Sequence, residues 1–472
     1  MQKNKTGLTR PAAASLSYIL TAGAGKLAAL LTLPFFTARL GAAAFGRYAL
    51  YICYEGLLFS AVALGLGGAS VYRALQRFRG EENRLLSAAF GLSLTIGLPI
   101  FSVAAFLLRA KLSPLLIAVL FAQVMARIAF TLYGAKCRYL YRYRPICALN
   151  LVADLGAPLG GIFLLLLFGG GERARIFAGA AVAVLLGVIS LTSILRKGAR
   201  PFDKEIWRYL FSLQLPLLPH YLSIAFMAEA ARLTVERVLG SEALGAYSIA
   251  HSVGLALSIL TVSLGGAFQP WLLRKVAAGE HTRVALTTEK ITLFICTLSF
   301  FPILFAPELF SILAPASYAP GTAAVAALAF TVPLSFLSTV PICTSLSAGR
   351  RGAISAASLG AALIQLLLCP MLAARFGLGG AAGGALISYF SLFLFQSVFL
   401  PKKQKSVVNV KNCFLICASF SAVGCMIPYL YSYPILRIIL AFFYLIASAA
   451  QAIPLRSLLM EAKKKNAAHS AP

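Results

Sequence analysis

Five charged residues within long apolar stretches of this chain are candidates for chemistry: Lys26, Glu55, Arg127, Asp154 and Glu229. A charge in bilayer hydrocarbon costs about 2.5 to 3.5 kcal/mol on insertion scales, so such residues usually serve a substrate path, a proton relay or an internal ion pair. A guanidinium can also bind a phosphate through two parallel hydrogen bonds. The two cations therefore suggest recognition of an anionic group, and the three carboxylates suggest charge partners or coupling groups.

Lys26 lies deep within the first apolar stretch, about 11 residues or roughly 16 Å from either end at 1.5 Å per residue. Its side chain cannot easily extend to the membrane surface from that depth. Small residues such as Ala22 and Gly23 share its helical face, which favours a packed or water-lined surface over lipid. We expect Lys26 to face a cavity, and the alternative is an internal salt bridge to Glu55 or Asp154.

Arg127 lies well inside another apolar stretch, and two explanations for it remain open. Its guanidinium either captures a phosphate or forms an ion pair that ties helices together. Asp154 and Glu55 are expected to hold the two cations, although either carboxylate could titrate and couple transport to protons. Glu229 is a third candidate for a charge partner or coupling group.

Arg39 and Arg232 lie on the side of the membrane that we expect to face outward. They are candidates for receiving an anion at the mouth of a cavity, and the alternative is that they extend to the lipid headgroups. Pro34, Pro216 and Pro219 each remove a backbone donor in or near an apolar stretch, so they can kink two helices. These prolines are candidate hinges, with adaptation of helix packing as the alternative.

Long apolar stretches make up most of the chain and must position these residues. Of the 472 residues, 60% are hydrophobic and only 12% are charged, which is more apolar than a soluble core requires. A membrane-spanning helix needs about 20 mostly apolar residues. The predicted fold class is an all-α integral membrane protein with about 14 such helices, at 15–38, 48–72, 85–108, 113–135, 146–168, 174–195, 207–231, 243–267, 290–313, 321–346, 352–374, 378–400, 412–431 and 434–457.

The basic residues alternate between the gaps that separate these stretches. Thirty of the 42 Lys and Arg residues fall in every second gap, and ten fall in the others. Because cytoplasmic loops carry an excess of Lys and Arg, this asymmetry predicts a multi-pass protein of the bacterial inner membrane with both termini in the cytoplasm. The net charge of +28 is thereby explained by topology and by contacts with anionic membrane lipids, so we expect no nucleic-acid partner.

A segment of the first half recurs in the second half. Leu40-Gly41-Ala-Ala-Ala-Phe-Gly-Arg-Tyr48 matches Leu239-Gly240-Ser-Glu-Ala-Leu-Gly-Ala-Tyr247. The first glycine of each copy is expected to close a tight turn at an outer loop. A weaker match relates Arg175 and the small residues after it to Arg375 and those after it. Two parallel six-helix repeats follow, related by an axis along the membrane normal.

The repeats predict three parts of the chain. Residues 1–200 form an N-terminal six-helix bundle, and residues 201–400 form a C-terminal six-helix bundle. Residues 401–472 add two C-terminal transmembrane helices and a basic cytoplasmic tail.

A set of motifs spread over nearly the whole chain carries a family resemblance: Pro34-Phe-Phe-Thr-Ala-Arg39-Leu-Gly41 through Gly46 and Tyr48, Leu215-Pro216-Leu-Leu-Pro219-His220, Arg232 through Gly245-Ala-Tyr247-Ser-Ile-Ala250, Gln269-Pro-Trp271, and Arg375-Phe-Gly377-Leu-Gly-Gly380-Ala-Ala382. With these motifs the chain resembles the multidrug/oligosaccharidyl-lipid/polysaccharide (MOP) flippase superfamily, especially its polysaccharide-export branch. Relatives often carry Asp-Arg where this chain has Ala231-Arg232, so the adjacent carboxylate is missing, although Glu229 lies nearby.

The resemblance implies a MATE-like, V-shaped pair of six-helix bundles that moves lipid-linked oligosaccharide by alternating access. We expect a flippase for an isoprenoid-diphosphate-linked precursor of a cell-surface polysaccharide, with Lys26 and Arg127 neutralising the diphosphate. The first alternative is a MATE-type drug or organic-cation antiporter, which would favour a carboxylate-dominated cavity. A polytopic polysaccharide polymerase or ligase is a lower alternative, because every outer loop is short.

Enzymatic chemistry is not expected. Gly23-Ala-Gly25-Lys26 lacks the spacing and the following Ser or Thr of a phosphate-binding loop. Asp154 and Asp203 are the only aspartates, so no Asp-x-Asp metal-nucleotide site exists. The nine cysteines contain no Cys-x-x-Cys pair, so no metal is expected. We expect no cofactor, with H⁺ or Na⁺ as candidate coupling ions and polysaccharide assembly proteins as candidate partners.

Overall fold

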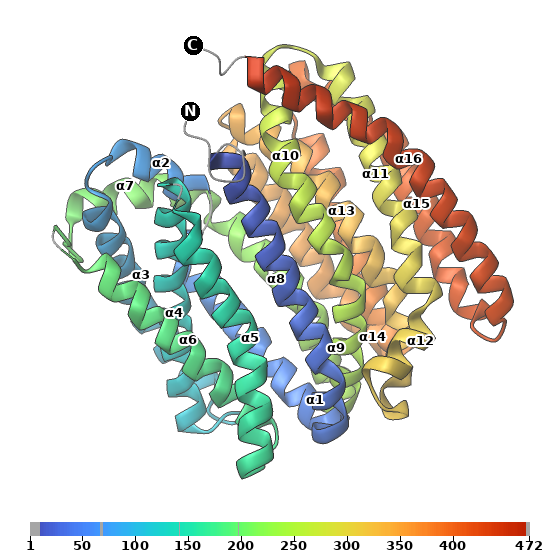
Figure 1. Cartoon of the computed structure of the whole chain (residues 1–472), viewed down its shortest axis with the longest axis horizontal. Coiled ribbons are helices and arrows are strands. Elements are labelled where there is room, and N and C mark those ends of the chain that lie inside the picture. Colours follow the sequence, from blue (N-terminus) through green and yellow to red (C-terminus); the bar gives the residue numbers. More distant parts are fainter. Residues whose placement is uncertain (1–9, 67–68, 141, 197, 469–472) are drawn as a thin grey trace. The chain divides into compact units, whose positions relative to one another are not determined.

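The computed structural model describes residues 10–66, 69–140, 142–196 and 198–468 (Figure 1). Within these ranges all regular secondary structure is helical, and there is no strand. Contacts between residues divide it into two compact units, Met1–Glu229 (unit 1) and Ala230–Pro472 (unit 2). The chain is an all-α integral membrane protein, as predicted.

Unit 1 is built on a pair of long helices, α3 and α4, whose buried residues form one apolar core with the second half of α1. Helices α5 and α6 pack together, and each also contacts α1. The elements of this unit are α1 (Arg10–Ala63), α2 (Ala69–Arg77), α3 (Glu82–Leu108), α4 (Pro114–Tyr139), α5 (Tyr143–Phe168), α6 (Glu172–Ile194), α7 (Lys204–Gln214), the 3₁₀ turn η1 (Leu215–Leu217) and α8 (Leu218–Leu239), which continues into unit 2.

Unit 2 is centred on α13, which packs along α14, α11 and α9 and is the most deeply buried span. The two last helices lie against α11. The elements are α9 (Ser241–Gly254), η2 (Leu255–Leu257), α10 (Ser258–Ala277), α11 (His281–Leu304), α12 (Ala306–Leu313), η3 (Ala316–Gly321), α13 (Thr322–Ser347), α14 (Arg351–Val398), η4 (Lys402–Val407), α15 (Val410–Met426), η5 (Ile427–Leu430) and α16 (Pro434–Ala468).

Eleven segments of the described chain are long and apolar enough to cross a membrane. The difference from fourteen arises where the chain bends without a loop. The stretches predicted at 15–38 and 48–72 lie mainly on α1, before and after a kink at Gly41, and those at 352–374 and 378–400 lie mainly on α14, before and after a kink at Gly377. The stretch at 243–267 is divided among α9, η2 and α10. The number of fourteen crossings therefore stays a prediction.

Glycines divide the two longest helices. Gly41 in α1 has φ 72° and ψ 167°, and Gly377 in α14 has φ 59° and ψ −139°, so neither residue continues a helix. Gly240, the repeat counterpart of Gly41, has φ 89° between α8 and α9. Glycine populates this region without steric cost. The prediction that Gly41 and Gly240 close turns is confirmed.

The second predicted stretch ends earlier than expected. Helix α1 ends at Ala63, and the following Leu64 and Gly65 both have positive φ. Apolar composition continues through this turn into α2, so hydropathy alone overran the helix end. The prediction of a span to residue 72 is therefore wrong at its C-terminal boundary.

An aromatic cage around Arg175 fastens the bend of α1 to α6. The guanidinium carbon lies 3.9 Å from the ring centroid of Phe36, 4.1 Å from that of Tyr48 and 5.3 Å from that of Phe45. A guanidinium is attracted to the electron-rich faces of such rings. Two aromatics of the repeat motif, Phe45 and Tyr48, together with Phe36, thus hold the parts of α1 before and after Gly41 at one cation.

The C-terminal helices are fastened by a buried arginine. Arg437 of α16 donates Nη1 and Nη2 to the two carboxylate oxygens of Glu308 at 2.8 and 2.7 Å. Its Nη1 also donates to the carbonyl of Leu304 at the end of α11. The side chain is only 5% exposed. Arg437 lies near the start of the predicted stretch 434–457, and its contacts join α16 to α11 and α12.

Candidate substrate site

Two helices of unit 1 present matching polar residues at the same spacing. Tyr51, Glu55 and Phe59 follow one another at four-residue intervals on α1, as Gln123 and Arg127 do on α4. Residues four apart share a helix face. Tyr51 donates its hydroxyl to Gln123 Oε1 at 3.0 Å, and Arg127 Nη1 donates to Glu55 Oε1 at 2.9 Å. The guanidinium carbon also lies 4.2 Å from the Phe59 ring centroid.

The Arg127–Glu55 pair is asymmetric in its exposure. The Glu55 side chain is 8% exposed, whereas that of Arg127 is 44% exposed. Among the described side chains, Glu55 engages Arg127 through Nη1, and Nε and Nη2 have no hydrogen-bond partner. Two parallel N–H groups of the guanidinium remain for an external acceptor, which is the arrangement that bidentate phosphate recognition uses.

The ion pair predicted as one explanation for Arg127 is therefore present. Glu55 is the partner, and it joins α1 to α4 across 72 residues. The remaining donors leave the second explanation, contact with an anionic substrate, as a prediction. Pairing with a carboxylate lowers the cost of placing the arginine within a membrane span, whatever it binds.

Two other predicted carboxylates approach α1 at glycines. The Asp154 carboxylate of α5 packs against Gly25, where a Cβ would clash with it. Glu229 of α8 lies near Gly56, and a Cβ there would be 3.3 Å from Glu229 Oε1. Glycine at both positions admits a carboxylate close to the α1 backbone. Charged residues of α4, α5 and α8 thus converge on one helix.

The remaining predicted residues are more dispersed. Lys26 lies on α1 one position after Gly25, and its side chain is outside the described part of the structure. Arg39 is exposed, two residues before the bend at Gly41. Arg232 is half-buried on α8 in unit 2, where it acts electrostatically on His251 of α9. Ala231 precedes Arg232, so the position next to this arginine carries no carboxylate.

The candidate hinges fall at different kinds of position. Pro34 lies inside α1 without ending the helix. Pro216 lies within η1, where α7 gives way to a 3₁₀ turn before α8, and Pro219 is in the first turn of α8. The loss of backbone donors explains this change of helix type. Movement at these prolines stays a prediction.

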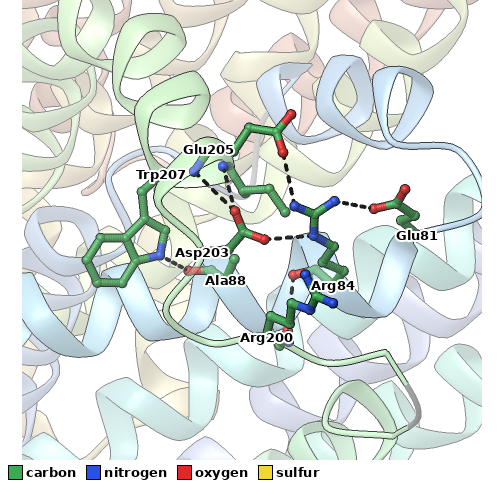
Figure 2. A network of polar contacts seen from close by, with 9 residues as sticks. Glu81, Arg84, Ala88, Arg200, Asp203, Glu205 and Trp207 are labelled. Atoms are coloured by element: carbon green, nitrogen blue, oxygen red, sulfur yellow. Dashed lines mark hydrogen bonds and ion pairs between the residues drawn. The ribbon is translucent and has the colours of Figure 1, made fainter.

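Sequence analysis missed a polar network at the end of unit 1 where α2, α3 and α7 meet (Figure 2). Arg84 of α3 contacts three carboxylates: Glu81 at 2.6 Å, Asp203 at 2.7 Å and Glu205 at 3.0 Å. Asp203 is buried and caps α7 by accepting from the backbone N–H groups of Glu205 and Ile206. Arg84 had been assigned to topology alone.

The same network holds the segment between α6 and α7 against α3. The backbone N–H of Arg200 donates to Ser87 Oγ at 2.8 Å, and Trp207 Nε1 donates to the carbonyl of Ala88 at 2.8 Å (Figure 2). At Gly91 the backbone of Pro201 approaches so closely that a Cβ would clash. The sequence can identify Asp203 as an N-cap, because an Asp before a helix is a common N-cap residue. No feature near Arg84 in the sequence indicates that it pairs with Asp203.

The electrostatics of Asp203 follow from these contacts. Burial by itself raises the pKa of this carboxyl, but hydrogen bonds from Arg84 and from the two backbone N–H groups favour the ionised form. The net effect lowers the pKa of Asp203 below its ordinary value. The network is therefore built around a charged aspartate.

Comparisons with known proteins agree with this architecture. A family model described as "Polysaccharide biosynthesis protein" matches residues 12–275. The structure of the lipid II flippase MurJ in an inward closed conformation matches with TM-score 0.62 and 14% identity, covering 95% of this chain and 100% of that chain. An inward-facing multidrug resistance MATE family transporter of the MOP superfamily matches with TM-score 0.56 and 14% identity, covering 85% and 95%.

A MOP superfamily transporter from Pyrococcus furiosus matches with TM-score 0.54 and 14% identity, covering 90% of this chain and 99% of that chain. A search of curated protein sequences finds no match. At these identities, the structural likeness establishes the MOP-type fold.

Proposed function

The chain belongs to the family of polysaccharide biosynthesis proteins, a family of MOP-type membrane flippases and transporters rather than enzymes, and we propose that it flips an isoprenoid-diphosphate-linked oligosaccharide. In this proposal the substrate moves from the cytoplasmic to the outer leaflet of the bacterial inner membrane by alternating access. Both termini would be cytoplasmic, as the alternation of basic residues favours.

The observation that carries the proposal is that Arg127 is partly exposed and bonds to Glu55 through one nitrogen only. An arginine of a spanning helix avoids hydrocarbon, so a side chain that is 44% exposed favours a water-filled face. Glu55 occupies one nitrogen and leaves a two-donor edge. A diphosphate offers acceptor oxygens that match this edge, and its charge would be compensated without removing Glu55.

Lys26 would supply a second cation on α1. The sugar would occupy the aqueous cavity while the isoprenoid tail stays in the bilayer. Outward movement of negative charge is favoured by an inside-negative potential by about 2.3 kcal/mol per charge per 100 mV. The proposal therefore needs no nucleotide, and H⁺ or Na⁺ coupling through Asp154 or Glu229 would add to the potential.

A second candidate function is export of organic cations, and the environment of Asp154 favours it. This membrane carboxylate has no ion pair among the described side chains. Glu55, by contrast, is neutralised by Arg127, which disfavours it as a cation site. We therefore rank the flippase first.

The test is complementation of a strain that lacks the gene. Arg127→Ala should lower the amount of lipid-linked oligosaccharide that reaches the outer leaflet by roughly tenfold or more, the worth of one charge-assisted contact. Leaflet location is measured with a membrane-impermeant reagent that modifies the sugar. Arg109→Ala is the matched control, because Arg109 also stacks on a phenylalanine, Phe106, at 4.1 Å, but at the end of α3.

A charge-neutral double variant separates substrate contact from helix pairing. Glu55→Gln/Arg127→Gln removes both charges and can keep a hydrogen bond between α1 and α4. It should fold and still fail to deliver substrate to the outer leaflet. Normal delivery by this variant would overturn the proposed role of Arg127. Unchanged lipid distribution in the deletion strain, together with greater drug sensitivity, would favour the antiporter.

A further inference from the structure

A second cationic site lies away from Arg127, in a cavity between α2 and α7. The cavity has a volume of about 520 Å³, and its lining combines three cations, one carboxylate, one aromatic ring and one hydroxyl: Arg77, Arg208 and Lys204, with Glu205, Tyr209 and Ser212. It belongs wholly to unit 1. Figure 1 shows α2 and α7 side by side at one end of this unit, and the two helices are in contact.

The two short helices are amphipathic, which explains how the cations are presented. Lys204 and Arg208 are one turn apart on the exposed face of α7, while Ile206, Leu210 and Leu213 are buried on the other face. A short helix with basic residues on one side and apolar residues on the other suits a membrane interface. Because α7 forms the N-terminal end of the candidate span Lys204–Leu239, which includes the predicted stretch 207–231, its cations would lie at headgroup level.

Arg77 completes the cluster from α2. Its guanidinium carbon lies 4.6 Å from the ring centroid of Tyr209. Tyr209 belongs to α7, so this stacking holds the Arg77 guanidinium against the helix whose cations line the same cavity, and it leaves the N–H edge for hydrogen bonding. Positive charge in a cytoplasmic loop is expected for topology, but topology does not require three cations around one concave space.

The carboxylate of the cavity does not cancel this charge. Glu205 Oε2 accepts from Arg84 Nη2 at 3.0 Å, so its charge is engaged by the neighbouring network. Two exposed aromatic residues are close in sequence to the cavity lining: Phe202, just before α7, is 74% exposed, and Phe211, on α7, is 39% exposed. Aromatic and basic side chains together are typical of the membrane interface.

We infer that the α2–α7 cavity binds the phosphate headgroup of an anionic phospholipid, with Arg77, Lys204 and Arg208 as its cationic contacts. Basic pockets at the cytoplasmic end of membrane helices suit such headgroups. The assignment of this lipid to the cytoplasmic leaflet rests on the proposed function and its topology. Because α7 is tied to α3 by Arg84, a bound headgroup would add a lipid-dependent contact between α2 and the segment that links the repeats.

The chain offers a local optical probe for this site. It contains two tryptophans, Trp207 on α7 and Trp271 on α10. In a Trp271→Phe background, the fluorescence of Trp207 reports lipid near the cavity. The full-length protein is placed in vesicles of phosphatidylcholine that contain brominated phosphatidylglycerol or, separately, brominated phosphatidylcholine, and quenching gives the relative affinity for the two headgroups.

Phosphatidylglycerol should be preferred by roughly tenfold or more at low salt, since each cation at headgroup level contributes about fivefold. Arg77→Gln/Lys204→Gln/Arg208→Gln should abolish the preference. Arg79→Gln/Arg144→Gln/Arg196→Gln removes the same charge from exposed positions outside this cavity and should retain it. Arg127→Ala should also retain it, which separates this inference from the proposed function.

Equal quenching by the two brominated lipids, or an equal preference in both triple variants, would overturn the inference. Competition by inorganic phosphate at constant ionic strength tests a soluble ligand. If millimolar phosphate removes the preference, the cavity is a site for free phosphate and the lipid assignment is wrong. If phosphate leaves it unchanged, the lipid assignment is supported.

Discussion

Unit 1 contains two arginine sites that differ in how fully their donors are used. Arg84 contacts three carboxylates and its side chain is 23% exposed. Arg127 contacts one carboxylate through one nitrogen and is 44% exposed. The first guanidinium has its donors committed to protein, and the second keeps an edge for another acceptor. The number of donors committed to protein acceptors therefore distinguishes the fastening arginine, Arg84, from the candidate binding arginine, Arg127.

The largest expected effect is on stability at Arg84. Arg84→Gln should lower the free energy of unfolding more than the other substitutions below, because the buried Asp203 loses its charged partner. The neutral Glu55→Gln/Arg127→Gln variant should lose about 1 kcal/mol or less. Chemical unfolding of the two variants in detergent, monitored by intrinsic fluorescence, measures both losses of unfolding free energy. Equal losses would break the distinction between the sites.

Replacement by lysine tests whether the planar edge of Arg127 matters. Arg127→Lys keeps the charge but loses the two-donor fork, so transfer to the outer leaflet should fall by about fivefold. Initial transfer rates in reconstituted vesicles measure this effect. Arg84→Lys is the control and should lower stability while leaving the transfer rate of the folded protein near that of wild type. A normal rate for Arg127→Lys would argue for simple charge compensation.

Removal of the negative charge at Glu55 should strengthen substrate binding, whereas the Arg127 substitutions weaken it. Glu55→Gln leaves Arg127 in place but no longer neutralises it, so affinity for a diphosphate analogue should rise by about threefold. Equilibrium binding of an isoprenoid-diphosphate analogue to the purified protein provides the measurement. Glu81→Gln, which removes one partner of Arg84, should leave that affinity unchanged. A fall in affinity for Glu55→Gln would show that Glu55 orients Arg127 rather than competing with substrate.

The smallest expected effect is a pH dependence at Asp203. Because its pKa is lowered in the folded protein, the carboxylate stabilises the fold above the ordinary Asp value near 3.9, and this stabilisation is lost as the pH falls through the folded pKa. The stability difference between wild type and Asp203→Asn should therefore be constant at neutral pH and shrink below about pH 4. Asparagine keeps the helix cap. A difference that does not change with pH would contradict the charged network.

Much of the fold could be predicted because its determinants are local. The apolar stretches identified the membrane helices, and the repeated Leu-Gly motif identified turns at Gly41 and Gly240. Hydropathy failed at Ala63, where the chain turns at Leu64 and Gly65 without becoming polar. The breaks that hydropathy placed between 38 and 48 and between 374 and 378 coincide with the non-helical residues Gly41 and Gly377.

The candidate site was predicted in part. Arg127 and Glu55 were singled out because each is a charge in an apolar stretch, but the sequence left open whether Glu55 would meet Arg127 or Lys26. Tyr51 and Glu55 are four residues apart, as are Gln123 and Arg127, and this matching spacing in the sequence was overlooked. Arg84 was counted only as a topology signal because its partner Asp203 is 119 residues away.

The sequence by itself determined the class of the protein, its repeated helices and the residues that membrane burial makes costly, because hydrocarbon penalises charge wherever a helix crosses it. The tertiary structure decided which charges meet. Helix packing brought Glu55 to Arg127 and Asp203 to Arg84, and it left the first arginine partly open and the second enclosed. Those pairings depend on distances between helices far apart in the chain, which local composition does not encode.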